Sequence, residues 1–493
     1  MGQLRSRPAI RRRRHVRLRS LLVLLPILLG LLGASGWSAA HGRGPVFRGL
    51  AALRRALPAW LGPSWTSYGG GPSHTFAVLP SALTPTSVAH LAPAWHVRAD
   101  GEVEGDPVLA GGRVFFGSFQ GTLYAADASS GRVLWQRRLD GTPLDGGPLE
   151  DQGRLYVSTS GGRMFSLDPR NGRTLWESAP LFTGVDDAVR ASPELWQGIL
   201  YQSLGGQGDS QGEEGGVVAV DERTGRILWR TLLVHYVGGG AAVFGPPVVI
   251  PQLGELVVGT GNPTPFPGDN GADGPVPDGS DPDADSLVAL SLKTGRVIWT
   301  AQAHAHDGAD LDFIAAPNVV QLADGGLAVG DGSKDGEYHL VDAVTGKPLW
   351  STSLIPPATD TLIVATAAVS EGRIFVGTMD VSDADAASNW PGNYQQPGTG
   401  HLVALDASSG RVLWSDPLPS TIAAAPLASP GLVLTLEADG TLLAVDATSG
   451  RAVWSTKVPG QVWNAEAAPA LAGRTLLLPL ANPGGLAAYR LTG

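Results

Sequence analysis

YAADASSGRVLW (residues 124–135) carries the repeat that decides the fold: an apolar strand ends in Asp, a turn follows, and Gly, Arg and finally Trp close the unit. The interval from Asp to Trp is eight residues in every copy, with Ser291 replacing Asp in the fourth. One copy cannot bury its own apolar face, so the copies must stack on one another. The six further copies are FSLDPRNGRTLW (165–176), VAVDERTGRILW (218–229), VALSLKTGRVIW (288–299), HLVDAVTGKPLW (339–350), VALDASSGRVLW (403–414) and LAVDATSGRAVW (443–454).

Each unit contains enough chain for four short strands. In residues 107–138, apolar and polar residues alternate in short runs, which is typical of half-buried strands. Asp begins the turn of the repeat, and Gly supplies the positive φ that the turn needs. The Trp that follows can lie across the face of the neighbouring unit. Four antiparallel strands repeated radially form the blades of a β-propeller.

The two ends of the repeat region set the number of blades. Trp95 in LAPAWHVR has the same apolar approach as the other tryptophans but no turn before it. Residues 468–491 supply only three strands. The strand through Trp95 would complete that last unit, so we predict an all-β, eight-bladed propeller of four-stranded antiparallel blades, closed by its N-terminal strand. Units three to six are longer than the others, which predicts insertions in their loops.

Composition restricts the classes of partner and site. The formal net charge is −10, and eight arginines lie within the first twenty residues, so the remaining chain is near −18. An acidic body argues against nucleic acid as a partner. The absence of Cys excludes disulfides, thiolate zinc sites and covalently attached c-type haem.

The N-terminal region predicts export. An Arg-rich start runs into an apolar stretch at residues 21–37, with small residues up to Ala40. Residues 1–40 are therefore expected to be a secretory signal peptide or an uncleaved membrane anchor. We expect residues 41–64 to be a linker and residues 65–493 to form the propeller. The propeller would then be periplasmic, secreted, or anchored to the cytoplasmic membrane facing outward.

The Ala-x-Asp-x-x-x-Gly-x-x-x-Trp pattern, together with the opening WTSYGGGPSHTF (65–76), resembles the quinoprotein dehydrogenase repeat family. Its members include methanol, ethanol and polyvinyl alcohol dehydrogenases that use pyrroloquinoline quinone (PQQ). The resemblance covers about residues 65–490. It implies an exported alcohol dehydrogenase that transfers hydride from a small or polymeric alcohol to PQQ, with an unknown electron acceptor.

The same fold also serves non-catalytic scaffolds, such as the outer-membrane assembly lipoprotein. The alternative function is therefore a platform for a protein partner at the cell envelope. A sensor or carbohydrate-binding module is a third alternative.

The first stretch that resembles the dehydrogenases is LVVGTGNPTPFPGDN (256–270). The family places a ligand of the catalytic metal at the position of Asn262. An amide oxygen is a suitable ligand for a hard cation such as Ca²⁺. Asn262 could instead simply hold a turn after the strand. The family's acidic metal ligand would lie upstream of the third repeat, where Glu213 is our candidate and Asp209 and Glu214 compete with it.

Two further stretches supply the candidate catalytic and cofactor residues. In WTAQAHAHDGADLDFIAAP (299–317), Asp310 falls where the family has its general base. Asp312 falls where lanthanide-using members have an additional metal ligand. In VGDGSKDGEYHLVD (329–342), Lys334 matches the family's cation beside the quinone. The alternatives are an acidic loop and a solvated Lys on a turn.

The chain also departs from the family pattern. Ala309 replaces an aromatic residue that is often Trp, the opening segment lacks its usual Arg, and the adjacent cysteines found in many members are absent. His304 and His306 would share a face on a strand, but the sequence shows no third ligand for them. A transition-metal site is therefore not predicted there.

Overall fold

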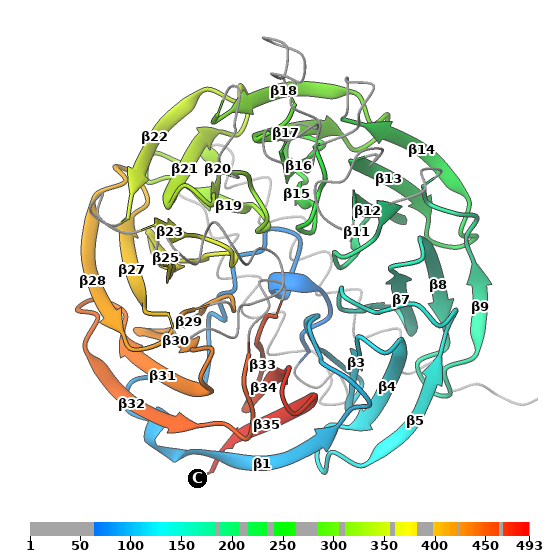
Figure 1. Cartoon of the computed structure of the whole chain (residues 1–493), viewed down its shortest axis with the longest axis horizontal. Coiled ribbons are helices and arrows are strands. Elements are labelled where there is room, and N and C mark those ends of the chain that lie inside the picture. The colour runs from blue at the N-terminus through cyan, green and yellow to red at the C-terminus, as the bar shows by residue number, and fades with distance from the viewer. Residues whose placement is uncertain are drawn as a thin grey trace, which may run out of the picture. The chain divides into compact units, whose positions relative to one another are not determined.

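The computed structural model describes residues 64–182, 187–206, 215–233, 241–262, 283–304, 311–354, 360–381, 398–422, 424–462 and 467–492. Within these residues, eight four-stranded antiparallel blades form a closed ring around a central channel (Figure 1). The predicted all-β, eight-bladed propeller is confirmed. The expected signal peptide or anchor, and the linker up to residue 63, lie outside the described residues. No helix in the described part of the chain is long and apolar enough to cross a membrane.

The strands of the first four blades follow one another along the chain from the channel outward. Blade one consists of β2 (Val108–Ala110), β3 (Arg113–Gly117), β4 (Thr122–Asp127) and β5 (Val133–Arg138). Blade two consists of β6 (Leu149–Asp151), β7 (Arg154–Thr159), β8 (Arg163–Leu167) and β9 (Thr174–Glu177). Blade three consists of β11 (Glu194–Trp196), β12 (Ile199–Gly206), β13 (Gly216–Asp221) and β14 (Ile227–Leu232), with the short β10 (Asp187–Ala188) also pairing with β12. Blade four consists of β15 (Val248–Ile250), β16 (Glu255–Gly259), β17 (Ser286–Ser291) and β18 (Val297–Gln302).

The later blades repeat this order, except that the outer strand of the last blade comes from the start of the propeller. Blade five consists of β19 (Asn318–Gln321), β20 (Leu327–Gly332), β21 (Glu337–Asp342) and β22 (Pro348–Ser353). Blade six consists of β24 (Ala368–Ser370), β25 (Arg373–Gly377), β27 (Gly400–Asp406) and β28 (Val412–Leu418), beside a separate pair β23 (Asp360–Leu362) and β26 (Met379–Val381). Blade seven consists of β29 (Leu427–Ser429), β30 (Leu432–Leu436), β31 (Thr441–Asp446) and β32 (Ala452–Lys457). Blade eight consists of β33 (Ala470–Ala472), β34 (Thr475–Leu480), β35 (Gly485–Leu491) and β1 (Leu91–Arg98).

The ring closes where the two ends of the propeller sequence pair. β1 runs antiparallel to β35, from Leu91 opposite Leu491 to Arg98 opposite Gly485. In Figure 1 the blue β1 therefore forms the outer edge of the blade whose other strands are red. The prediction that the strand through Trp95 completes the last unit is confirmed.

Seven contacts between neighbouring blades share one form, in which a Trp of one blade lies on the turn of the next. The Trp95 indole N–H donates to the Ala128 carbonyl oxygen at 3.1 Å, and Ala128 directly follows the turn residue Asp127. The ring also covers Gly131, where a Cβ would lie 2.7 Å from it. The same bond, at 2.9 to 3.2 Å, joins Trp135 to Pro169, Trp176 to Glu222, Trp229 to Leu292, Trp299 to Ala343, Trp350 to Ala407 and Trp414 to Ala447.

The conserved spacing of the repeat follows from this contact. Gly131 has a φ of +71° and no space for a side chain, so both the backbone and the Trp ring require glycine there. Asp127 Oδ1 accepts the N–H groups of Ser129 and Ser130, at 3.1 and 3.0 Å. Hydrogen bonds from these two serines lower the pKa of Asp127 to about 2. Ser291 has no carboxylate, yet its carbonyl oxygen still accepts the Gly295 N–H at 2.8 Å, so the backbone turn of the fourth repeat is kept.

A β-bulge next to the Trp directs its side chain toward the neighbouring blade. Ala125 pairs with Trp135, and the register then shifts between Ala125 and Ala126. The same shift occurs between the third and fourth strands of blades two to seven. An extra residue in one strand bends it and increases its local twist. The repeat therefore encodes both the acceptor turn and the orientation of the donor.

The segment Trp65–Val78 lies in the central channel and hydrogen-bonds to inner strands that would otherwise have an unpaired edge. Figure 1 shows it in blue at the centre of the ring. It exchanges backbone hydrogen bonds with Leu109 and Ala428, and its carbonyl oxygens accept further inner-strand N–H groups. In all, it bonds to residues of six inner strands: Leu109, Glu150, Val249, Val319, Val369 and Ala428. The opening segment is therefore part of the core of the ring.

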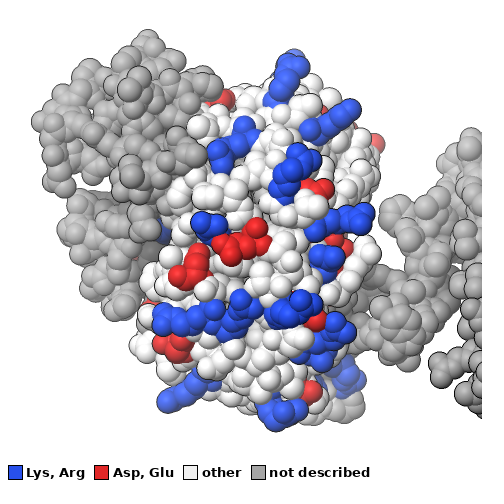
Figure 2. Space-filling model, turned by 90° about the vertical axis from the view of Figure 1, so that its right-hand side faces the viewer, with Lys and Arg blue, Asp and Glu red and all other residues white. Residues whose placement is uncertain are grey.

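The outer rim carries the cations of the repeat. Figure 2 shows that Lys and Arg side chains outnumber Asp and Glu on the side of the ring turned to the viewer. The Arg or Lys that follows the turn glycine is exposed in each repeat: Arg132, Arg173, Arg226, Arg296, Lys347, Arg411 and Arg451. The acidic excess of the chain therefore does not lie on this side.

Replacing Trp299 with Phe tests the contact between blades. Trp299 is 8 % exposed and donates to Ala343, which is fully buried. We expect Trp299→Phe to lower the free energy of unfolding by about 1–3 kcal/mol, because it leaves a buried carbonyl oxygen without its donor. Urea unfolding of the purified chain would measure the loss.

Trp454→Phe is the matched control. Trp454 belongs to blade seven and lies at the seam with blade eight. The fourth strand of blade eight is β1, from the other end of the propeller, so within the described chain no turn of the repeat joins its third and fourth strands. Replacement of Trp454 should cost less than that of Trp299. Equal losses in the two variants would contradict a role for the indole N–H.

Candidate functional site

The loops of one face bring the predicted site residues together. In an antiparallel blade, the connection between the second and third strands and the connection to the next blade leave from the same end. Asn262 follows β16, Asp312 precedes β19, and Lys334 lies between β20 and β21. All three residues therefore lie at the same face, where blades four and five adjoin.

Lys334 and Asp312 form a buried ion pair. Lys334 Nζ lies 2.6 Å from Asp312 Oδ1, and the two side chains are 3 % and 0 % exposed. The Lys334 backbone N–H also donates to the Asp312 carbonyl oxygen at 3.0 Å. Removing either charge would leave the other buried and uncompensated, so each residue holds the other in place. Lys334 is therefore not the solvated turn residue considered as an alternative.

The segment that carries Asn262 lies beside the second oxygen of the same carboxylate, through the adjacent Gly261. Asn262 is fully buried, and its carbonyl oxygen accepts the Ala241 N–H at 2.9 Å. A Cβ at the adjacent Gly261 would enter the space beside Asp312 Oδ2, at 3.1 Å from that oxygen. Asp312 thus directs Oδ1 toward Lys334 and Oδ2 toward the segment that carries Asn262.

Asp331 is a buried acid near this site that our sequence analysis did not single out. It lies on β20 and is 1 % exposed. Its Oδ1 accepts the Gly332 N–H at 2.9 Å, and its Oδ2 has no hydrogen-bond partner among the described residues. A Cβ at Gly259 would lie 3.0 Å from Oδ2. Burial raises the pKa of Asp331 well above its usual value. The available signal in the sequence was an acidic residue between two glycines, Gly330 and Gly332.

Two of the predicted site residues lie outside the described residues. Asp310, the expected base, falls in 305–310, two positions before Asp312. Glu213, with its competitors Asp209 and Glu214, falls in 207–214, between β12 and β13. Their roles remain predictions.

The described donors fit a hard cation. Asn262 and Asp312 supply amide and carboxylate oxygens, which are the ligands that Ca²⁺ and related ions take. Both residues are fully buried. The glycine at position 261 keeps the space next to Asp312 Oδ2 open. Asn262 and Asp312 are therefore the described residues that would hold such a cation, with Lys334 beside Oδ1 of the carboxylate.

Comparison with protein families identifies the class of this propeller. A model described as outer membrane protein assembly factor BamB matches residues 86–201 and 334–493. A second model, described as the glucose/ethanol/alcohol dehydrogenase β-propeller domain, matches residues 241–369, which include Asn262, Asp312 and Lys334. The first match alone covers more than half of the chain. The chain belongs to the PQQ-repeat β-propeller family.

Curated relatives are named as dehydrogenases. A polyvinylalcohol dehydrogenase from Sphingopyxis sp. (strain 113P3) is 25 % identical over 68 % of this chain and 56 % of its own length. A polyvinylalcohol dehydrogenase from Pseudomonas sp. is 22 % identical over 76 % of this chain and 64 % of its own length. The chain thus spans less than two thirds of either relative.

Solved structures show the same fold. The quinohemoprotein alcohol dehydrogenase from Comamonas testosteroni superimposes with a TM-score of 0.72, at 17 % identity, over 90 % of this chain and 82 % of its own. A europium-containing methanol dehydrogenase gives 0.72, at 16 % identity, over 87 % and 98 %. BamB from Moraxella catarrhalis gives 0.56, at 16 % identity, over 81 % and 99 %.

Another buried acid lies where the first three blades adjoin. Asp106 is 1 % exposed, and its Oδ1 accepts a hydrogen bond from Ser192 Oγ at 2.6 Å. Ser192 Oγ in turn accepts the Gly147 N–H at 2.8 Å, so the group links blades one, two and three. Burial, with a smaller contribution from the charge of Glu194, raises the pKa of Asp106 to about 7, although the hydrogen bond from Ser192 acts in the opposite direction.

This pKa predicts a stability that depends on pH. Between about pH 4 and 7, folded Asp106 keeps a proton that the unfolded chain releases, so the free energy of unfolding falls as pH rises through this window. The shift of about three pKa units corresponds to a loss on the order of 4 kcal/mol. Asp106→Asn should reduce this slope in urea unfolding measured from pH 4.5 to 8, and the part that remains belongs to other buried acids with raised pKa values, such as Asp331.

Asp127→Asn provides the control for the pH effect. Asp127 is only partly buried and its pKa is about 2, so its replacement should leave the slope above pH 4 unchanged. A slope as steep in Asp106→Asn as in the wild type would contradict the raised pKa of Asp106.

Separate replacement of Lys334 and Asp312 tests the ion pair. We expect Lys334→Met or Asp312→Asn to lower the free energy of unfolding by about 3–5 kcal/mol each, because each leaves one buried charge uncompensated. The double variant should lose less than the sum of the two. Lys457→Met is the control, since the Lys457–Asp439 pair is 62 % and 44 % exposed and should contribute about 0–1 kcal/mol. Additive losses in the double variant would argue against coupling.

Proposed function

We propose that this chain is an exported PQQ-dependent oxidoreductase that oxidises an alcohol. The observation that carries the proposal is the buried Lys334–Asp312 pair beside the segment that carries Asn262, within the residues that match the alcohol dehydrogenase propeller model. Such a buried charge pair is costly to keep, and buried charges gather at functional sites. The names of the curated relatives support the same reaction class.

The residues of the site divide the work of oxidation. PQQ, when bound, would accept the hydride removed from the alcohol. Lys334 would bind the oxygens of the quinone and hold Asp312 in its orientation. Asn262 and Asp312, with Glu213 as the proposed acidic ligand, would bind Ca²⁺ or a related hard cation. Asp310 would accept the proton of the substrate hydroxyl.

The substrate and the acceptor are proposed more broadly. Both polyvinylalcohol dehydrogenases extend well beyond the part that this chain matches. We therefore propose an alcohol, small or polymeric, without choosing between them, and leave the electron acceptor open. The Arg-rich start and the apolar stretch at residues 21–37 support export, to the periplasm, the exterior or the outer side of the cytoplasmic membrane.

The second candidate is a non-catalytic scaffold that binds a protein at the cell envelope. The match of residues 86–201 and 334–493 to the assembly-factor model favours it. Ala309 in place of the aromatic residue, and the missing Arg and Cys residues, also favour it. This candidate predicts no binding of quinone.

Reconstitution distinguishes the two functions. The purified chain is mixed with PQQ and Ca²⁺, quinone binding is followed by absorbance, and dye-linked oxidation of ethanol and of polyvinyl alcohol is measured. We expect Asp310→Asn to keep quinone binding and to lower turnover by about 10²–10⁴-fold, because the proton acceptor is lost. Lys334→Ala should weaken quinone binding, whereas Lys347→Ala, which removes an exposed cation of the same blade, should not. If the wild type binds no PQQ at micromolar concentrations, the oxidoreductase proposal fails and the non-catalytic scaffold is the remaining candidate.

A further inference from the structure

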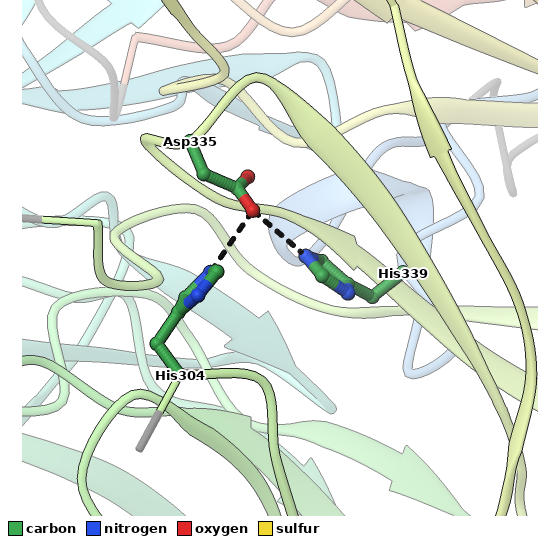
Figure 3. A group of neighbouring side chains, drawn as sticks. All are labelled: His304, Asp335 and His339. Atoms are coloured by element: carbon green, nitrogen blue, oxygen red, sulfur yellow. Dashed lines mark ion pairs between the residues drawn. The ribbon is translucent and has the colours of Figure 1, made fainter. Parts of the chain in front are cut away.

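Three potential metal ligands converge at the seam between blades four and five. His304 follows β18, the outer strand of blade four, while Asp335 lies in the β20–β21 turn and His339 lies on β21. His304 Nε2 lies 2.9 Å from Asp335 Oδ2, and His339 Nε2 lies 3.5 Å from the same oxygen. Figure 3 shows both imidazoles directed at the same oxygen of this carboxylate. One potential ligand atom from each residue lies within 4.8 Å of the other two.

The surrounding groups hold the three side chains in this arrangement. Asp335 Oδ1 accepts the Glu337 N–H at 2.7 Å and the Ser333 hydroxyl, which leaves Oδ2 to the imidazoles. The His339 ring packs edge-on against Phe313, with ring centroids 5.5 Å apart. Partners behind the ligands fix ligand orientation in metal sites in the same way. The side chains of His304, Asp335 and His339 are only 22 %, 11 % and 15 % exposed.

The spacing of the ligand atoms suits a small tetrahedral ion. A Zn²⁺ ion about 2.0–2.2 Å from each nitrogen and oxygen ligand holds its ligand atoms about 3.3 Å apart. The observed separations of 2.9 and 3.5 Å lie on either side of that value. Two imidazoles and one carboxylate are a donor set that Zn²⁺ and similar ions prefer, whereas Ca²⁺ takes mainly oxygen ligands.

The fourth position of such a site would face a pocket. The three residues line a pocket of about 350 Å³ together with Gln302, Glu337 and Trp350. Three protein ligands with one open position are typical of zinc sites that bind water or a small ligand.

We propose that His304, Asp335 and His339 bind a divalent transition-metal ion of the Zn²⁺ class. This site is separate from the hard-cation site of Asn262 and Asp312 and does not depend on the proposed oxidoreductase function. Because His304 belongs to blade four and the other ligands to blade five, the ion would crosslink the two blades. The ion would thus stabilise the seam beside Lys334.

The test uses the full chain without a His tag, stripped of metal and then kept in Ca²⁺ to fill the oxygen-ligand site. Titration with Zn²⁺ should show one tight equivalent per chain, and Co²⁺ in its place should give the strong visible absorption of a tetrahedral site. His339→Gln and Asp335→Asn should weaken Zn²⁺ binding by at least about 100-fold, since even groups behind a ligand are typically worth about 10–100-fold. Zn²⁺ should also raise the melting temperature of the wild type but not of these variants.

His401→Gln is the matched control. His401 Nδ1 lies 2.9 Å from Asp380 Oδ2, so this pair is also a half-buried His–Asp contact but has only one imidazole. Its replacement should leave Zn²⁺ binding unchanged. If circular dichroism shows that His339→Gln does not fold, His304→Gln takes its place as the ligand variant, since His304 lies just after the end of β18. Equal Zn²⁺ affinity in the wild type and the folded ligand variants, or no saturable binding up to about 100 μM, would overturn the proposal.

Discussion

The propeller depends on the hydrogen bond that a Trp indole of one blade donates to the turn of the next, a contact found at seven of the eight seams. A blade has two apolar faces and cannot bury either alone, so its register against the neighbouring blade must be set. The indole sets it at one point, because its N–H reaches one carbonyl oxygen and its ring covers one glycine. One of these seven seams joins blade eight to blade one, and it uses Trp95, which comes from the start of the propeller. The strand β1 therefore closes the ring by pairing with β35 and also supplies the docking contact to blade one.

The regular contact on the rim leaves the other positions of a blade free to vary. Because the Asp-to-Gly turn and the Trp lie at outer strands, the loops at the face of Asn262 and Lys334 take no part in this contact between blades. Long and chemically distinct connections can therefore be placed there without loss of the fold. Blades four and five use this freedom most, since one seam carries the Lys334–Asp312 pair and the His304–Asp335–His339 cluster.

Both groups at this seam depend on contacts between residues far apart in the sequence. The sequence pointed to Asn262, Asp312 and Lys334 separately, through three motifs, but it could not show that Lys334 binds Oδ1 of Asp312. It also paired His304 with His306, its neighbour on a strand. The structure places His304 next to Asp335 and His339, which belong to the following blade. Asp331 was missed because a carboxylate on a buried strand gives no local pattern beyond its two flanking glycines.

The sequence by itself determined the strand order, the number of blades and the closing strand. These features arise from local patterns repeated at a fixed interval: a turn that needs Gly, a Trp eight residues after Asp, and an unfinished last unit. Only the tertiary structure decided which side chains share a buried space at the seam of blades four and five. That outcome depends on how one blade registers against the next, which brings together residues that no local spacing connects. The position of the channel segment Trp65–Val78 was likewise decided by the tertiary structure, because its hydrogen-bond partners come from six different blades.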